Sequence, residues 1–112
     1  MTPDDAKACL LALLRSDEWE LSERARREGT SALRWIHDRD PTDYDMVKYV
    51  ITLLEADAVL RCAPQGDPPG STGIAWQMTD SHNVFIKLQI REYRMGHEYA
   101  YLQSIHTSVH KK

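Results

Sequence analysis

The sequence predicts an α+β domain, with N-terminal helices packed on one face of a small antiparallel sheet. In the first half of the chain, apolar residues recur at helical spacing. From about residue 73 onward, apolar and polar residues alternate, as they do in half-buried strands. Between these parts lies APQGDPPGSTG, residues 63–73, whose three prolines and three glycines indicate a connector. We therefore expect one domain, residues 1–112, with a helical part over about 1–62 and a sheet over about 73–108.

The first two helices have clear start signals. Thr2 is placed to cap a helix that has proline at its first position and runs to about Arg15. Residues 19–21, Trp-Glu-Leu, follow as a short extended segment. Ser22 then begins a charged second helix with the sequence ERARRE. Gly29 is expected to interrupt this helix, and the Asp-Pro step at residues 40–41 ends it.

A third helix and three strands complete the predicted order. Thr42 or Asp43 caps a helix whose apolar positions are spaced three and four residues apart: Tyr44, Val47, Ile51, Leu54 and Ala58. Residues 73–78, GIAWQM, have the composition of a strand, and residues 79–82 that of a turn. Two further strands form a hairpin around a turn at residues 94–97: NVFIKLQIR, residues 83–91, and EYAYLQSIH, residues 98–106.

The hairpin carries most of the residues capable of chemistry. Counting back from a turn at residues 94–97 places Lys87 opposite Ser104. The same count places Phe85 opposite His106. One sheet face, which we expect to be at least partly open, then holds Lys87, Gln89, Arg91, Ser104 and His106. A turn longer or shorter by one residue would move the second strand's set to the opposite face, so this grouping depends on the register.

The charge distribution limits the partners. The formal net charge is −3, but residues 1–60 hold 13 acidic and 8 basic residues, whereas residues 61–112 hold 4 and 6. An acidic chain is unsuited to nonspecific coating of nucleic acid, yet a locally basic sheet can hold a phosphate chain. Most of the ERARRE run is expected to be a solvated helix face with internal ion pairs, from which arginines 24, 26 and 27 can add phosphate contacts.

The sequence also predicts a cytoplasmic protein that has no membrane partner. The chain begins with an acidic segment where a signal peptide would be basic, and no apolar run approaches the roughly 20 residues of a membrane span. Cys9 and Cys62 have no spacing that indicates a disulfide framework, so we interpret them as reduced thiols. Four histidines, at positions 82, 97, 106 and 110, do not follow a zinc-site spacing, and we expect neither a metal nor another cofactor.

Several words in this order resemble the MqsR-like toxins of bacterial type II toxin-antitoxin systems. The resemblance covers about residues 19–108 and includes ELSERARREG, DYDMVKYVITLLEAD, IAWQM, NVFIKLQI and LQSIH. It implies a RelE-like fold and a metal-independent endoribonuclease that cleaves mRNA, in some cases on the ribosome, and that a cognate antitoxin protein neutralises. By position in these words, the resemblance implies site roles for Gln77, Lys87 and His106.

The chain departs from the family's pattern in two words. Phe85 stands where the family has tyrosine, and a phenylalanine can stack on a base but cannot form a hydrogen bond. The family's lysine-serine word after the third helix is replaced by AVLRCAP, in which Arg61 is the one candidate equivalent.

Metal-independent RNA cleavage uses the neighbouring 2′-hydroxyl as nucleophile, so the protein must move protons and neutralise charge on the phosphorane. Lys87 and Arg91 suit charge neutralisation, and His106 is the candidate acid or base because an imidazole exchanges a proton near neutral pH. Binding and base stacking are assigned to Gln77, Phe85, Gln89, Ser104 and Arg61.

Structural roles for the same residues give the alternative. A strand histidine is often a surface residue, and Lys87 can belong simply to the polar side of an exposed strand. The alternative function is then a non-catalytic protein-binding module on the same scaffold, such as a phage-borne inhibitor or an inactivated relative of the toxins.

Overall fold

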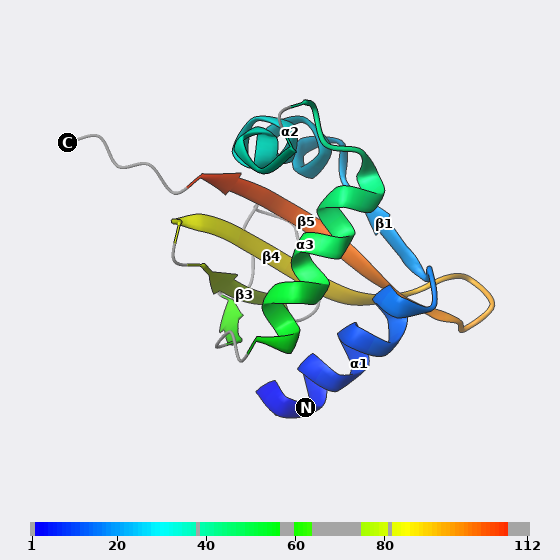
Figure 1. The fold of residues 1–112 in the computed structure, drawn as a ribbon. Coiled ribbons are helices and arrows are strands. Elements are labelled where there is room, and N and C mark those ends of the chain that lie inside the picture. The colour runs from blue at the N-terminus through cyan, green and yellow to red at the C-terminus, as the bar shows by residue number, and fades with distance from the viewer. Residues whose placement is uncertain (1, 38, 57–59, 64–74, 81, 108–112) are drawn as a thin grey trace.

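The computed structural model describes residues 2–37, 39–56, 60–63, 75–80 and 82–107 (Figure 1). Its elements, in chain order, are α1 (Pro3–Arg15), β1 (Trp19–Leu21), α2 (Glu23–His37), α3 (Asp43–Glu55), β2 (Arg61–Ala63), β3 (Ala75–Thr79), β4 (Val84–Glu92) and β5 (Glu98–Thr107). The predicted α+β class is confirmed. The expected connector, residues 63–73, lies outside the described residues except for Ala63, as do Ala58 of the expected third helix and His110.

The predicted helix starts are confirmed by their hydrogen bonds. The Thr2 hydroxyl accepts from the backbone N–H of Asp5, and the Thr42 hydroxyl accepts from that of Asp45, at 3.1 Å in each case. The two aspartates also accept in return from the backbone N–H of their cap residues, which completes a capping box at each helix. Ser22 starts α2, because its hydroxyl accepts from the backbone N–H of Ala25 at 2.9 Å.

The expected interruption at Gly29 is wrong, since α2 continues through it to His37. A Cβ added at Gly29 would lie 2.8 Å from the Met46 sulfur and 3.3 Å from Ile105 Cβ. The glycine therefore lets α2 approach both α3 and β5 closely. A helical glycine costs up to about 1 kcal/mol relative to alanine, but an alanine at this position would clash with α3 and β5.

The five strands form one sheet in the order β1-β5-β4-β3-β2. The sheet is mixed and not wholly antiparallel as predicted, because β1 pairs in parallel with β5 while the other neighbours are antiparallel. β1 reaches β5 only after the chain has formed α2, α3 and three other strands, and such a long connection allows a parallel pair. β2 lies where we expected the helical part to end and the connector to begin. Its three residues are too few to show a strand period.

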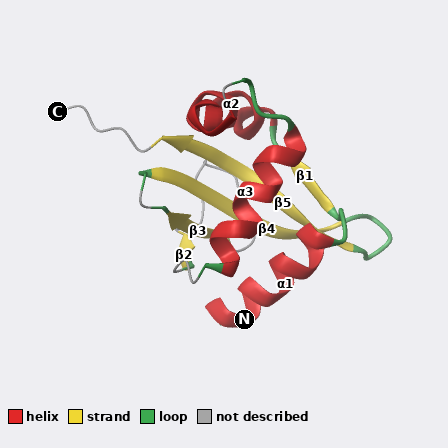
Figure 2. Ribbon diagram, viewed as in Figure 1, coloured by secondary structure: helices red, strands yellow, loops and turns green. Residues whose placement is uncertain are grey.

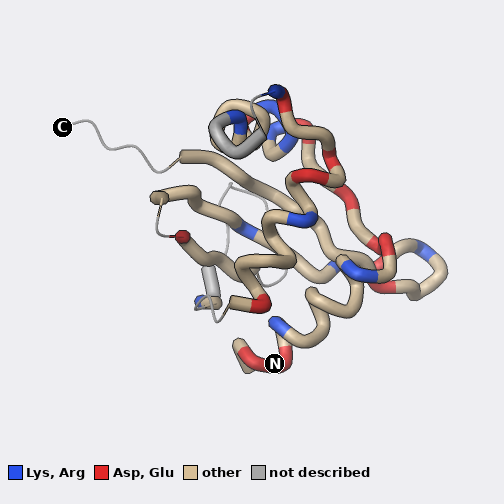
Figure 3. Tube along the Cα trace, viewed as in Figure 1, with Lys and Arg blue, Asp and Glu red and all other residues tan. Residues whose placement is uncertain are grey.

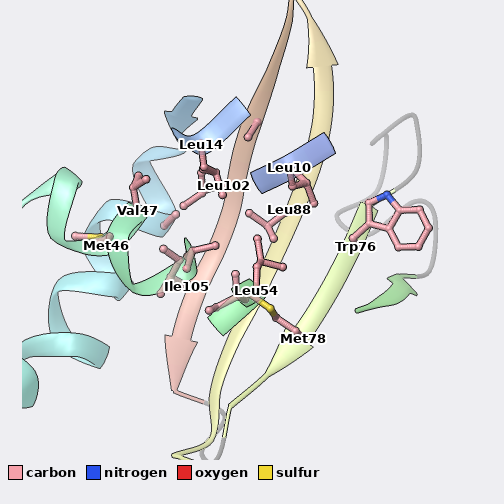
Figure 4. Packing of buried hydrophobic residues seen from close by; sticks show 14 of the residues in the cluster. Leu10, Leu14, Met46, Val47, Leu54, Trp76, Met78, Leu88, Leu102 and Ile105 are labelled. Carbon is pink, nitrogen blue, oxygen red and sulfur yellow. The ribbon is translucent and has the colours of Figure 1, made fainter. Parts of the chain in front are cut away.

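The core lies between the helices and one face of the sheet. In Figure 2, α1 and α3 cross this face and α2 lies beside β5. Figure 4 shows leucines of α1 and α3 meeting aliphatic side chains of β4 and β5. The largest fully buried side chains include Leu10, Leu14, Leu54, Ile86, Leu88, Leu102 and Ile105. Tyr44, which we expected among the apolar positions of α3, is 65% exposed and forms a T-shaped ring contact with Trp19 instead.

The predicted cross-strand partners in the hairpin are confirmed at the end away from the turn. Lys87 lies opposite Ser104 and Phe85 opposite His106. Near the turn the register differs by one residue from our count, since Glu92 and not Tyr93 faces Glu98. A β-bulge on β5 at Gln103 corrects this difference, so the expected pairs form beyond it.

No helix in the described part of the chain is both long enough and apolar enough to cross a bilayer.

Candidate functional site

One row of side chains crosses four strands on the face opposite the core, which we call the polar face. The register pairs Arg61 of β2 with Gln77 of β3, Gln77 with Lys87 of β4, and Lys87 with Ser104 of β5. Directly paired residues project from the same side of a sheet. Four of the predicted site residues, distant in sequence, are therefore neighbours in one line, which we call the Lys87 row.

The next row brings Phe85 and His106 together. Their ring centroids are 5.1 Å apart with the planes tilted by 42°. The His106 Nδ1 lies 3.2 Å from the backbone carbonyl oxygen of Thr107, to which a protonated Nδ1 donates. In a neutral ring with this tautomer, Nε2 carries the lone pair and can accept a proton. Phe85 and His106 are both half-buried.

The polar face, which we expected to be at least partly open, is buried at its middle and exposed at its sides. Lys87 is 5% exposed, Gln89 4% and Ser104 6%. Arg61 and Thr79 at one side are exposed, and so is Arg91. An amine and an amide that are this deeply buried do not form the solvated side of a strand. The alternative that Lys87 belongs simply to the polar side of an exposed strand is therefore wrong.

One pocket lies at the β2 end of the Lys87 row, and a second lies beside His106 of the next row. The first, of about 390 Å³, is lined by Arg61, Gln77, Met78 and Thr79, and so contains two of the predicted binding residues. The other, of about 450 Å³, lies between α2 and the end of β5, and we call it the α2–β5 pocket. Its lining is formed by Arg24, Arg27, Glu28, Ser31, Ala32, His106 and Thr107. The predicted site thus extends from β2 across the sheet to α2.

The structure separates Arg91 from this group. Arg91 pairs with Tyr99, six residues along β4 from Phe85, which corresponds to about 20 Å at about 3.3 Å per residue. Its guanidinium carbon lies 3.8 Å from the centre of the Tyr101 ring, and its Nε donates to the Gln89 side-chain oxygen at 2.9 Å. Arg91 therefore forms a cluster with Gln89 and Tyr101 toward the turn end of the hairpin.

This second cluster continues into the turn. The rings of Tyr93 and Tyr99 stack at a centroid distance of 4.2 Å. The Tyr93 hydroxyl donates to Glu20 at 3.2 Å. Loss of hydration raises the pKa of Tyr93, and the hydrogen bond to Glu20 and its negative charge raise it further. From the sequence we assigned no role to these tyrosines. A strand without a bulge would place Tyr99 on the face opposite Ser104 and His106, and the bulge at Gln103 brings it to the polar face.

Basic and acidic side chains lie at different places in the molecule. Figure 3 shows basic positions on α2, whereas acidic positions gather around β1 and the start of α3. Of the three α2 arginines proposed as phosphate ligands, Arg24 and Arg27 line the α2–β5 pocket. Arg26 instead donates to both carboxylate oxygens of Asp43, at 3.0 and 3.3 Å from its Nε, and this pairing raises the Arg26 pKa.

His82 and His97, the two other histidines whose side chains are described, lie outside the site. His82 belongs to the turn between β3 and β4, where the Asp80 carboxylate accepts from the backbone N–H groups of His82 and Val84, each at 2.8 Å. His97 is exposed in the hairpin turn. Within the described ranges, no three side chains of histidine, cysteine, aspartate or glutamate come together as a set of metal ligands.

Comparison of the chain with protein-family models, with curated proteins and with solved structures found no match. The resemblance to MqsR-like toxins therefore depends on the quoted sequence words, and the site must be judged on its own geometry.

Proposed function

We propose that this protein is a cytoplasmic endoribonuclease of the RelE-like, MqsR-like class, which cleaves mRNA without a metal and is held inactive by an antitoxin protein. The observation that carries the proposal is the juxtaposition of Lys87 and His106 in adjacent rows of one sheet face. A buried cation beside an imidazole, with an aromatic ring against that imidazole, supplies the groups that RNA cleavage by 2′-hydroxyl attack requires.

In this proposal each side chain has a distinct task. Nε2 of His106 takes the proton from the 2′-hydroxyl, because Nδ1 is committed to the Thr107 carbonyl. The Lys87 ammonium stabilises the negative charge that develops on the phosphorane, and its burial strengthens that interaction. The bond between phosphorus and the 5′-oxygen then breaks to leave the cyclic phosphate, and the leaving 5′-oxygen takes its proton from water. Phe85 stacks on a neighbouring base, a role that does not need the hydroxyl of a tyrosine.

The remaining residues bind the strand. Arg61 and Gln77, which line the 390 Å³ pocket, contact phosphate and base edge at the β2 side of the Lys87 row. Ser104, opposite Lys87, supports the reactive phosphate. Arg91 is not included in the reactive group, because it lies about 20 Å along β4 and is engaged by Tyr101 and Gln89.

The test is cleavage of a defined single-stranded RNA by the wild-type protein, Lys87→Ala and His106→Ala, in the presence of a chelator. We expect the wild type to leave 2′,3′-cyclic phosphate ends, and each variant to lose about 100-fold or more in rate. Circular dichroism and thermal melting of all three proteins exclude unfolding as the cause. Equal cleavage by the three proteins, or none by any of them with and without ribosomes, would falsify the nuclease proposal.

One observation favours the second candidate, a non-catalytic protein-binding module. Lys87 and Ser104 are almost fully covered, so a substrate phosphate needs local rearrangement to reach them. Expression in a bacterial host separates the two candidates. A nuclease toxin arrests growth and degrades transcripts unless an antitoxin is supplied, whereas a binding module leaves transcripts intact.

A further inference from the structure

The α2–β5 pocket is formed because the second half of β5 has a helix beside it. β1 pairs with β5 only as far as Leu102. Beyond that point, no further strand pairs with this edge of β5 among the described residues. The Ser22 hydroxyl donates to the carbonyl oxygen of Gln103 at 2.8 Å and so fixes the start of α2 against this edge. The first turns of α2 therefore face the end of β5, where His106 lies (Figure 1).

The pocket wall on α2 is a donor surface for an anion. Arg24 and Arg27 are three residues apart and so lie on one side of the helix, with Ser31 one turn further on. Arg27 forms no ion pair with any described residue, whereas Arg24 donates to Glu28 at 3.1 Å. A guanidinium is a planar donor that matches the oxygens of a phosphate group.

The opposite wall is formed by His106 and Thr107, and His106 lies in the row next to the Lys87 row. The volume of the α2–β5 pocket, about 450 Å³, lies within the range of about 300–1,000 Å³ that is typical of ligand pockets. The space therefore admits a nucleotide and not only an ion. A strand whose reactive phosphate lies over Lys87 and His106 can continue into this pocket without leaving the protein surface.

We propose that the α2–β5 pocket binds a backbone phosphate of single-stranded RNA next to the cleaved one, with Arg27 as its principal ligand. This inference rests on the proposed function for the position of the cleaved bond. Glu28 opposes binding, because its carboxylate both engages Arg24 and repels the phosphate. Arg27 and Glu28 therefore have opposite effects on affinity for the same ligand.

The experiment measures binding of a fully 2′-O-methylated oligoribonucleotide, which cannot be cleaved, by fluorescence anisotropy over a range of salt concentrations. We expect Arg27→Gln to weaken binding about tenfold and to reduce the salt dependence by about 0.7 in the log-log slope, the loss of one contact to a single strand. The matched control is Arg94→Gln, which removes the same charge from the exposed hairpin turn and is expected to change neither quantity.

A second variant removes a negative charge from the pocket instead of a positive one, by substitution of Glu28. We expect Glu28→Gln to tighten binding severalfold, whereas Glu92→Gln, an exposed carboxylate at the end of β4, changes it little. Thermal melting of each variant confirms folding. A variant that binds more tightly cannot owe its effect to partial unfolding, so this arm protects the inference from a folding artefact.

The outcomes separate this inference from the proposed function. If Arg27→Gln behaves like Arg94→Gln while the wild type cleaves unmodified RNA, the phosphate subsite is wrong and the nuclease proposal stands. If binding depends on Arg27 but unmodified RNA is never cleaved, the subsite stands and the nuclease proposal is wrong. A wild type that does not bind the oligonucleotide overturns the subsite.

Discussion

The two ends of the β4–β5 hairpin present similar kinds of side chain in different states. At the turn end, Arg91 lies over Tyr101 and bonds to Gln89, and Tyr93 stacks on Tyr99. At the other end, which we call the His106 end, Phe85 lies against His106, and Arg27 across the pocket has no ion pair with a described residue. Cations and rings occur at both ends, but Arg91 is engaged by its neighbours in the hairpin, whereas Arg27 forms no ion pair with a described residue.

This difference distinguishes a structural cluster, in which the cation already has partners, from a candidate binding site. A cation that already has a ring and an amide oxygen as neighbours gains little by exchanging them for a ligand. A guanidinium that lines a pocket without such neighbours can still gain charge-assisted hydrogen bonds. From the sequence we assigned Arg91 and His106 to one catalytic group, because both lie on the polar face. The distance along β4 is what separates them.

The largest expected contrast is in catalysis. We expect His106→Gln to lower the rate of RNA cleavage about 100-fold or more, because it removes the acid or base. Arg91→Gln should change the rate less than about threefold, since it lies remote from the reactive phosphate. Single-turnover cleavage of a defined RNA measures both. Comparable losses for the two variants would mean that the two ends act as one site.

Two glycines give a contrast in stability. We expect Gly29→Ala to lower the free energy of unfolding by about 1–3 kcal/mol, because the added Cβ meets the Met46 sulfur and Ile105. Gly96→Ala should lower the free energy of unfolding by about 1–2 kcal/mol, because alanine is strained at the φ of +87° that Gly96 adopts. The added Cβ itself would meet nothing within 4 Å. Urea denaturation measures both.

The two glycine variants should also differ in activity. Gly29→Ala displaces α2 from the end of β5 and should weaken RNA binding in conditions where the variant is still folded. Gly96→Ala, at the turn end, should leave binding unchanged. Wild-type RNA affinity in folded Gly29→Ala protein would contradict the view that α2 is part of the site.

A smaller effect is expected from the cation-π contact at the turn end. Removal of the Tyr101 ring in Tyr101→Leu should destabilise the fold by about 0.5–1 kcal/mol without lowering cleavage activity. A double-mutant cycle with Arg91→Gln isolates the pairwise term. A coupling energy near zero would show that the contact is not stabilising.

The smallest expected effect is a change in acid sensitivity at the start of α3. This region lies on the acidic side of the molecule, beside β1, where Trp19 contacts Tyr44. The backbone N–H of Thr42 and the Arg39 guanidinium lower the pKa of Asp45 from 3.8 to about 2. A lowered folded-state pKa contributes stability that is present above pH 4 and is lost as the pH falls toward 2.

We therefore expect Asp45→Asn to lose less stability than the wild type between pH 4 and pH 2, as followed by urea denaturation at each pH. Asp4→Asn, which removes a carboxylate from the first turn of α1 but leaves the Asp5 capping box in place, is the matched control. An identical pH profile for wild type and Asp45→Asn would refute the assignment.

The sequence predicted the elements that have local signals. The capped starts at Thr2, Ser22 and Thr42 were correct because a side chain three residues from a backbone donor acts within one helical turn. It missed β2, whose three residues show no period, and the parallel pairing of β1. Both depend on partners far away in the chain, which local patterns do not report.

The site was predicted in part for a related reason. Lys87, His106, Phe85 and Ser104 were grouped correctly, because the cross-strand count beyond the bulge agrees with the structure. Arg27 was named only as a possible phosphate contact, since nothing local links α2 to the end of β5. The burial of Lys87 was missed, because alternation identifies the face of a strand but not what covers it.

The bulge at Gln103 has a consequence for how the length of this chain can vary. Without Gln103, the register near the turn continues unbroken, and Lys87 still faces Ser104 while Phe85 still faces His106. A one-residue deletion here is thus silent for the pairing, as contacts between residues 85 and 106 in an NMR spectrum of the deletion variant would show. It would, however, remove the carbonyl that Ser22 bonds to. A β5 shortened by this one residue would therefore keep the same side chains on each face. It would, however, change how α2 is positioned against the strand.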